Sequence, residues 1–187
     1  MYWHPPTHTV YLAHPRTASQ ATKDALMEQA DFRCVGSHHD GIERAMNNQA
    51  HRGPKPEELD ELWCFTTVRN HFDAVVSWLY GGDREAELPI GPDQVDEITE
   101  IHAANYIESG RLWPFAARAD ELIRYERLPR ALNDVLGMRG LGPVDLPREN
   151  VSSGRPHAGY RELISPEGRE AIEERWSEEM SELGYGW

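Results

Sequence analysis

The stretch "VYLAHPRTASQATKDAL", Val10 to Leu26, decides the fold of this chain. Its apolar run ends at His14-Pro15, a basic residue and small or hydroxylated residues follow, and a helical pattern begins near Gln20. This order is typical of a strand, a phosphate-binding loop and a helix. The glycines and the Gly-Lys-Ser/Thr ending of a nucleotide P-loop are missing. The stretch therefore raises the question of which anion a phosphate loop without glycines would hold.

Strands and helices alternate along the rest of the chain. Apolar runs predict strands over 7–14, 32–37, 61–68 and 121–125, and apolar periodicity predicts helices over 20–30, 70–80, 93–109 and 128–136, with a short one near 42–47. Asn70 is the expected N-cap of one helix, and Ser165-Pro166 starts the last helix. The alternation predicts an α/β fold of three layers, a parallel sheet with flanking helices, whose ligands lie beyond the carboxyl ends of the strands.

The composition limits the classes of function. The 187 residues fit one domain spanning 1–187, with 39% hydrophobic and 27% charged residues. We find neither an apolar run of membrane-spanning length nor a signal-peptide pattern, so we expect a cytoplasmic protein without a membrane partner. The net charge of −13 argues against nucleic acid as a partner and requires that any anionic ligand be held by a local basic cluster. We expect Cys34 and Cys64 to be buried free thiols; a disulfide between them is the alternative.

Two segments at predicted strand ends carry anion-binding groups. In the first, Pro15 to Thr22, the start of a helix offers backbone N–H groups and Arg16 adds a fixed charge. Further donors in this segment are the hydroxyls of Thr17, Ser19 and Thr22. In the second segment, "TTVRNHFDAVVSW", Arg69 ends a buried strand and Ser77 lies two helical turns later. This spacing lets a guanidinium and a hydroxyl converge on one anion.

Together these motifs resemble those of the sulfotransferases that use 3′-phosphoadenosine 5′-phosphosulfate, most closely the small bacterial and carbohydrate-type members. "HPRTASQAT" is similar to the family's 5′-phosphosulfate-binding loop, and "VRNHFDAVVSW" is similar to its 3′-phosphate-binding motif. "LIRYERL" and the C-terminal "NVSSGRPHAGYRELISPEGREAIEERW" continue the resemblance in the family's order.

The resemblance implies a P-loop NTPase-like sulfotransferase core and a donor nucleotide bound without metal. It places the 5′-phosphosulfate on Pro15, Arg16, Thr17, Ala18, Ser19, Gln20, Ala21 and Thr22. It places the 3′-phosphate on Arg69 and Ser77, and a basic residue that closes over the nucleotide at Arg155, with Ser152 and Ser153 beside it. Such a donor has no β- and γ-phosphates and no magnesium, which would explain a phosphate loop without the Gly-Lys-Ser/Thr ending.

Two residues depart from the family pattern. Arg16 stands where many members have a lysine, and an arginine also stabilises charge on a leaving oxygen but does not donate a proton. His71 replaces the usual proline after Arg69-Asn70, a change that the first turn of a helix tolerates.

Sulfuryl transfer to a hydroxyl requires a general base, and "VGSHHDG" places two histidines just past the second predicted strand. We favour His39 over His38 as this catalytic base, with Asp40 able to orient either ring; Asp40 and Glu43 are the next candidates for the base. A polar surface turn and a His-His-Asp metal site are the alternatives for this segment.

The acceptor is expected to be a hydroxyl of a saccharide or small molecule, or of a peptide tyrosine, in a pocket formed by 41–56 and 81–92. The sequence does not indicate an oligomeric state. Two other functions stay open: a nucleotide-dependent kinase-like enzyme, and an inactive scaffold that retains the nucleotide site. The missing Gly-Lys-Ser/Thr argues against the first, and Arg16 with the histidine pair argues against the second.

Overall fold

The computed structural model describes residues 1–39, 42, 45, 53–80, 87–106, 111–147, 156 and 158–187. The chain forms two compact units. The first consists of Met1–Val68 and Phe115–Asn150, and the second of Arg69–Pro114 and Val151–Trp187.

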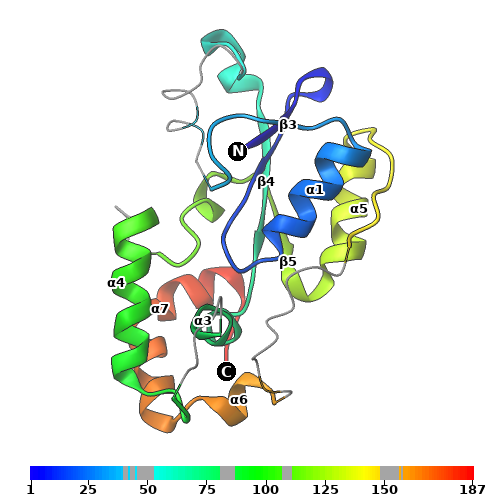
Figure 1. Cartoon of the computed structure of the whole chain (residues 1–187). Helices are drawn as coiled ribbons and strands as arrows, with labels where there is room; N and C mark the ends of the chain where they lie inside the picture. The colour runs from blue at the N-terminus through cyan, green and yellow to red at the C-terminus, as the bar shows by residue number, and fades with distance from the viewer. Residues whose placement is uncertain are drawn as a thin grey trace. The chain divides into compact units, whose positions relative to one another are not determined.

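The first unit is built on a five-stranded mixed sheet with the strand order β3-β1-β2-β4-β5 (Figure 1). The strands are β1 (Tyr2–His4), β2 (Thr9–Leu12), β3 (Arg33–Cys34), β4 (Trp63–Val68) and β5 (Glu121–Arg124). β2, β4 and β5 are parallel, with Leu12 opposite Thr66 and Val68 opposite Arg124. The chain is therefore an α/β protein with a parallel centre, as its sequence predicts.

The expectation of a wholly parallel sheet is wrong because of β1. Only a 3₁₀ turn, η1 (Pro5–Thr7), and His8 in the left-handed conformation join β1 to β2, so the two strands form an antiparallel hairpin. β1 is also antiparallel to β3. β3 therefore runs in the same direction as β2, and the carboxyl ends of β2, β3, β4 and β5 lie at one edge of the sheet.

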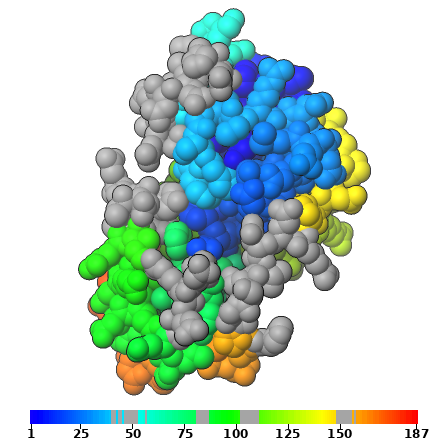
Figure 2. Space-filling view, in the orientation of Figure 1, coloured from blue at the N-terminus to red at the C-terminus, as the bar shows by residue number. Residues whose placement is uncertain are grey.

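Successive side chains of β2 point to opposite faces of the sheet, and each face has its own apolar core. Tyr11 packs with α1 (Ser19–Gln29) and α5 (Leu128–Met138) on one face, whereas Val10 and Leu12 pack on the other face against residues that include Ile42 and Phe115. α1 and α5 lie side by side (Figure 1), and in the space-filling view α1 and the segment after it form a continuous part of the visible surface of this unit (Figure 2). Short 3₁₀ helices η2 (Pro56–Glu61), η3 (Ala116–Arg118) and η4 (Tyr125–Arg127) complete this unit.

The second unit is helical and contains α3 (His71–Leu79), α4 (Pro92–Tyr106), α6 (Tyr160–Leu163) and α7 (Pro166–Leu183). Both predicted N-caps are confirmed: Asn70 accepts a hydrogen bond from the Phe72 amide, and Ser165 accepts one from the Gly168 amide. Among the described residues, no helix combines the length and the apolarity needed to cross a lipid bilayer.

Both cysteines are free thiols, but only Cys64 is buried. The expectation that Cys34 is buried is wrong, because β3 is a two-residue strand at the edge of the sheet with both residues exposed. Burial raises the pKa of the Cys64 thiol to about 11, with Asp120 adding to the shift.

Candidate functional site

The loop between β2 and α1 adopts backbone angles that usually belong to glycine. Arg16 has a φ of 62° and Ala18 a φ of 57°, both in the left-handed region. A non-glycine residue there is strained by roughly 1–2 kcal/mol, and such outliers concentrate at binding sites. Turns that alternate left- and right-handed residues make concave groups of N–H donors that bind anions. Arg16 and Ala18 flank Thr17, so the loop has left-handed residues at alternate positions, a feature that such anion-binding turns share.

Three side chains hold the carbonyl groups at the end of β2. The Thr66 hydroxyl donates to the Leu12 oxygen at 2.5 Å, His39 Nδ1 bonds the Ala13 oxygen at 2.8 Å, and the Thr17 hydroxyl donates to the His14 oxygen at 2.8 Å. These three successive carbonyls lie at and just beyond the end of the strand, where a side chain supplies the partner that a neighbouring strand would otherwise provide. The loop is therefore anchored on its carbonyl side.

The N–H groups at the start of α1 are the donors that this arrangement offers to an anion. The Thr22 hydroxyl donates to the Ala18 oxygen at 3.0 Å, so the hydroxyl protons of Thr17 and Thr22 are both donated to backbone carbonyls. The first helical bond runs from the Thr22 amide to the Ala18 oxygen, so the amides of Ser19, Gln20 and Ala21 precede it. Pro15, Ser19 and Ala21 are buried, and Arg16 is half-buried.

A buried tyrosine lies beneath the loop. The Tyr11 side chain is fully buried, and the hydroxyls of Thr67, Thr22 and Thr17 lie beside its phenol oxygen. Burial raises the pKa of Tyr11 to about 12, and the neighbouring hydroxyls counteract part of this shift. The phenol is therefore a neutral, polar floor beneath the loop.

His38 and His39 follow β3 at the same edge of the sheet as the loop. His39 reaches the loop through the Ala13 carbonyl, and because a carbonyl only accepts, Nδ1 of His39 carries the proton. In the neutral ring the lone pair then lies on Nε2. His38 Nδ1 bonds the Tyr2 hydroxyl at 2.5 Å, and the two imidazole centroids are 4.1 Å apart.

In the second unit, Asp73 and Ser77 are four residues apart and so share one side of α3, and Arg69 lies just before this helix. Arg69 is 6% exposed and Ser77 is 8% exposed. The Asp73 carboxylate accepts from Arg69 Nε at 2.6 Å and lies 2.6 Å from Arg69 Nη2, which fixes one edge of the guanidinium. A planar guanidinium fixed in this way suits recognition of a phosphate.

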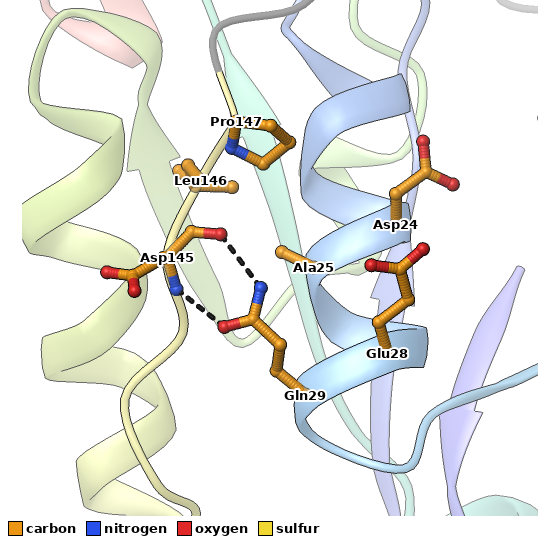
Figure 3. A pocket seen from close by; sticks show the side chains of 7 residues that line it. All are labelled: Asp24, Ala25, Glu28, Gln29, Asp145, Leu146 and Pro147. Atoms are coloured by element: carbon orange, nitrogen blue, oxygen red, sulfur yellow. Dashed lines mark hydrogen bonds between the residues drawn. The ribbon is translucent and has the colours of Figure 1, made fainter.

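A separate cavity of about 560 Å³ opens in the first unit between α1 and the segment 145–147 (Figure 3). The Gln29 amide bridges it by donating to the Asp145 oxygen at 3.0 Å and accepting from the Asp145 amide at 2.8 Å. Carboxylates of Asp24, Glu28 and Asp145 line it, so the cavity repels phosphate and we do not assign the anion to it.

Some predicted site residues lie outside the described part of the chain, namely Asp40, Glu43, Ser152, Ser153 and Arg155. The predicted acceptor segments 41–56 and 81–92 are described only in part. Among the described residues, no group of three or more His, Cys, Asp or Glu side chains is placed to hold a metal ion.

Thr66 and Tyr2 are site residues that were not predicted from the sequence. Thr66 is one of two polar residues in an apolar strand, a pattern that could have indicated a buried hydroxyl with a backbone partner. Tyr2 had no such signal, because the strand that carries it was not predicted.

No protein-family model, curated protein or solved structure matches this chain.

Proposed function

We propose that this protein is a sulfotransferase, built on a P-loop-like three-layer core, that moves a sulfuryl group from 3′-phosphoadenosine 5′-phosphosulfate to an acceptor hydroxyl without a metal. The observation that carries the proposal is the anchored loop with left-handed Arg16 and Ala18 at the start of α1. Its backbone amides and Arg16 suit an anionic group, and it lacks the Lys-Ser/Thr pair that a magnesium triphosphate requires.

In this proposal the loop and Arg16 hold the 5′-phosphosulfate in the first unit. The acceptor oxygen attacks sulfur while the bond from sulfur to the 5′-phosphate oxygen breaks. Arg16 stabilises the charge on that departing oxygen, and Nε2 of His39 takes the acceptor proton. The products are the sulfate ester and 3′-phosphoadenosine 5′-phosphate.

The second unit has the residues proposed for the 3′-phosphate. Arg69 is nearly buried and oriented by Asp73, and Ser77 lies one further turn along α3. A guanidinium and a hydroxyl of this kind would distinguish a 3′-phosphorylated nucleotide from AMP. The proposed acceptor is a saccharide or a small molecule with a hydroxyl group.

Calorimetry tests the donor class. In the presence of EDTA, 3′-phosphoadenosine 5′-phosphate should bind much more tightly than ATP does. Tighter binding of magnesium-ATP would overturn the proposal in favour of a kinase-like enzyme. Tight binding of the spent donor without transfer to any acceptor would indicate a scaffold.

Turnover tests the base. His39→Ala should lower turnover by about 10²–10⁴-fold and leave nucleotide affinity within a few-fold. Thr66→Val is the matched control, because it removes another of the three loop anchors and no titratable group. Equal losses of turnover in the two variants would assign His39 to loop structure alone.

A further inference from the structure

Two neighbouring histidines in the first unit are held by partners of opposite kind. His39 Nδ1 faces a backbone carbonyl, which accepts, whereas His38 Nδ1 faces the Tyr2 hydroxyl, which is able to donate. Each ring is thus bonded through Nδ1, and the geometry of imidazole directs Nε2 away from that bond. Nε2 is the second hydrogen-bonding nitrogen of each ring.

The direction of the Tyr2–His38 bond follows from acidity. A phenol O–H is a stronger acid than a neutral imidazole N–H, so the phenol donates and His38 Nδ1 accepts. Burial, together with smaller contributions from the nearby His39 and Lys23, lowers the pKa of His38 to about 3, so the ring is neutral near pH 7. Burial raises the pKa of Tyr2 above its usual range, so its hydroxyl keeps the proton.

Packing also fixes the position of the Tyr2 phenol. The Cys34 thiol lies beside the Tyr2 hydroxyl but donates its own proton to the Gly36 oxygen at 3.5 Å, so it does not donate to the phenol. Tyr2 is 2% exposed, and its ring packs against Tyr11 with centroids 6.1 Å apart. The phenol is therefore held in place by packing as well as by its hydrogen bond to His38.

We propose that His38 and His39 are a donor–acceptor pair in opposite tautomers, with Tyr2 as the positioning residue that places the proton of His38 on Nε2. In its neutral form His39 then carries its lone pair on Nε2, whereas His38 carries an N–H there. The ring centroids are 4.1 Å apart, so the two imidazoles are direct neighbours.

The role of the pair in catalysis rests on the proposed function. There His39 accepts the proton of the acceptor hydroxyl, and His38 donates a hydrogen bond to an oxygen of the transferring sulfuryl group. A neutral donor suits this position, since it stabilises an anionic oxygen and does not compete with His39 for the acceptor's proton. The two histidines thus perform different tasks.

Nitrogen-15 NMR of the histidine rings at pH 7 reads the tautomers directly, with His38→Gln and His39→Gln to assign the signals. We expect the proton of His39 on Nδ1 and that of His38 on Nε2. Tyr2→Phe should leave His39 unchanged and give His38 a mixture of tautomers. Tyr11→Phe is the matched control, because it removes a phenol hydroxyl from the same core without a bond to His38. A His38 proton on Nδ1, or a charged His38, would overturn the inference.

Kinetics separates this inference from the proposed function. In an active enzyme, Tyr2→Phe should lower kcat by about 10-fold, the effect of one misplaced hydrogen bond, with the KM for the nucleotide within two-fold. If kcat is unchanged in Tyr2→Phe, His38 does not act as a hydrogen-bond donor in the reaction. Reversed tautomers in an active enzyme would overturn the inference alone, whereas the expected tautomers in a protein that transfers no sulfuryl group would overturn the proposed function.

Discussion

Glu179 is a buried carboxylate of α7 whose removal should destabilise the second unit strongly. It is 4% exposed and accepts three hydrogen bonds. Oε1 accepts from the Trp113 amide at 3.0 Å, and Oε2 accepts from the Leu112 amide and His71 Nε2, both at 2.9 Å. The carboxylate therefore ties the first residue of α3, the segment before Phe115 and α7 to one another.

The expected loss of stability follows from the hydrogen bonds that each substitution of Glu179 removes. Glu179→Gln keeps one oxygen and replaces the other by an NH₂ group, so in either orientation of the amide at least one N–H faces another donor. An unsatisfied buried donor costs about 1–3 kcal/mol, and a lost bond to a charged group about 1.5–3 kcal/mol. The two costs partly describe the same loss, so they do not add in full. We expect the free energy of unfolding to fall by about 2–4 kcal/mol for Glu179→Gln and by about 3–5 kcal/mol for Glu179→Ala.

Urea unfolding measures this loss. Trp113 and Trp176 lie with ring centroids 6.0 Å and 6.2 Å from that of His71, so tryptophan fluorescence reports on this region, and circular dichroism provides the second probe. The exposed neighbour Glu178 provides the control, and Glu178→Gln should change stability by less than about 0.5 kcal/mol. If Glu179→Gln and Glu179→Ala both match this control, the three bonds do not stabilise the fold and the reasoning fails.

Two further predictions concern the phosphate contact and a close approach of backbone. Arg69→Ala should weaken binding of 3′-phosphoadenosine 5′-phosphate by about 10- to 150-fold, the value of a charge-assisted bond. The affinity for AMP should be nearly unchanged. If calorimetry shows equal losses of affinity for the two nucleotides, Arg69 has a structural role only. Gly168→Ala should lower the free energy of unfolding by about 1–3 kcal/mol, because the added Cβ would lie 2.3 Å from the Ile90 oxygen. Gly137→Ala, also in a helix but with open space around it, should raise that free energy by roughly 0.5–1 kcal/mol. Urea midpoints that move in the same direction in the two alanine variants would contradict this pair.

The elements that the sequence predicts correctly have local signals. β4 and β2 are apolar runs, and α3 and α7 begin at a capping residue whose side chain does accept a hydrogen bond from the following turn. Such signals act over a few residues and need no knowledge of the rest of the fold. The core of the sheet was therefore predictable.

The errors arise where distant residues decide the structure. β1 has three residues beside a Pro-Pro pair, a composition that indicates a loop, and pairing with β2 and β3 makes it a strand. The same strand places Tyr2 against His38, 36 residues away. Cys34 looked buried because its run is apolar, but its position at the sheet edge exposes it. Strand order is a property of long-range pairing, which periodicity does not report.

The loop itself shows how tertiary contacts replace a sequence motif. Two residues in the left-handed region are strained by roughly 2–4 kcal/mol together, while three hydrogen bonds to the Leu12, Ala13 and His14 carbonyls contribute about 1.5–4.5 kcal/mol. The two sums are comparable, so the anchors are sufficient to hold angles that glycine would adopt without strain. No glycine pattern marks this loop, because the side chains that shape it come from three separate segments.

This origin of the loop shape also decides how its variants must be interpreted. His39 is at once an anchor of the loop and the proposed base, so a loss of turnover in His39→Ala alone does not separate the two roles. Thr66→Val removes one anchor of similar strength and should weaken nucleotide binding by a few-fold through the loop alone. The part of the His39→Ala defect that exceeds the Thr66→Val defect, appearing in turnover and not in nucleotide affinity, is the part that belongs to proton transfer. If the two variants show the same defects in both quantities, the loop needs His39 only as an anchor, and the base must be sought among other residues.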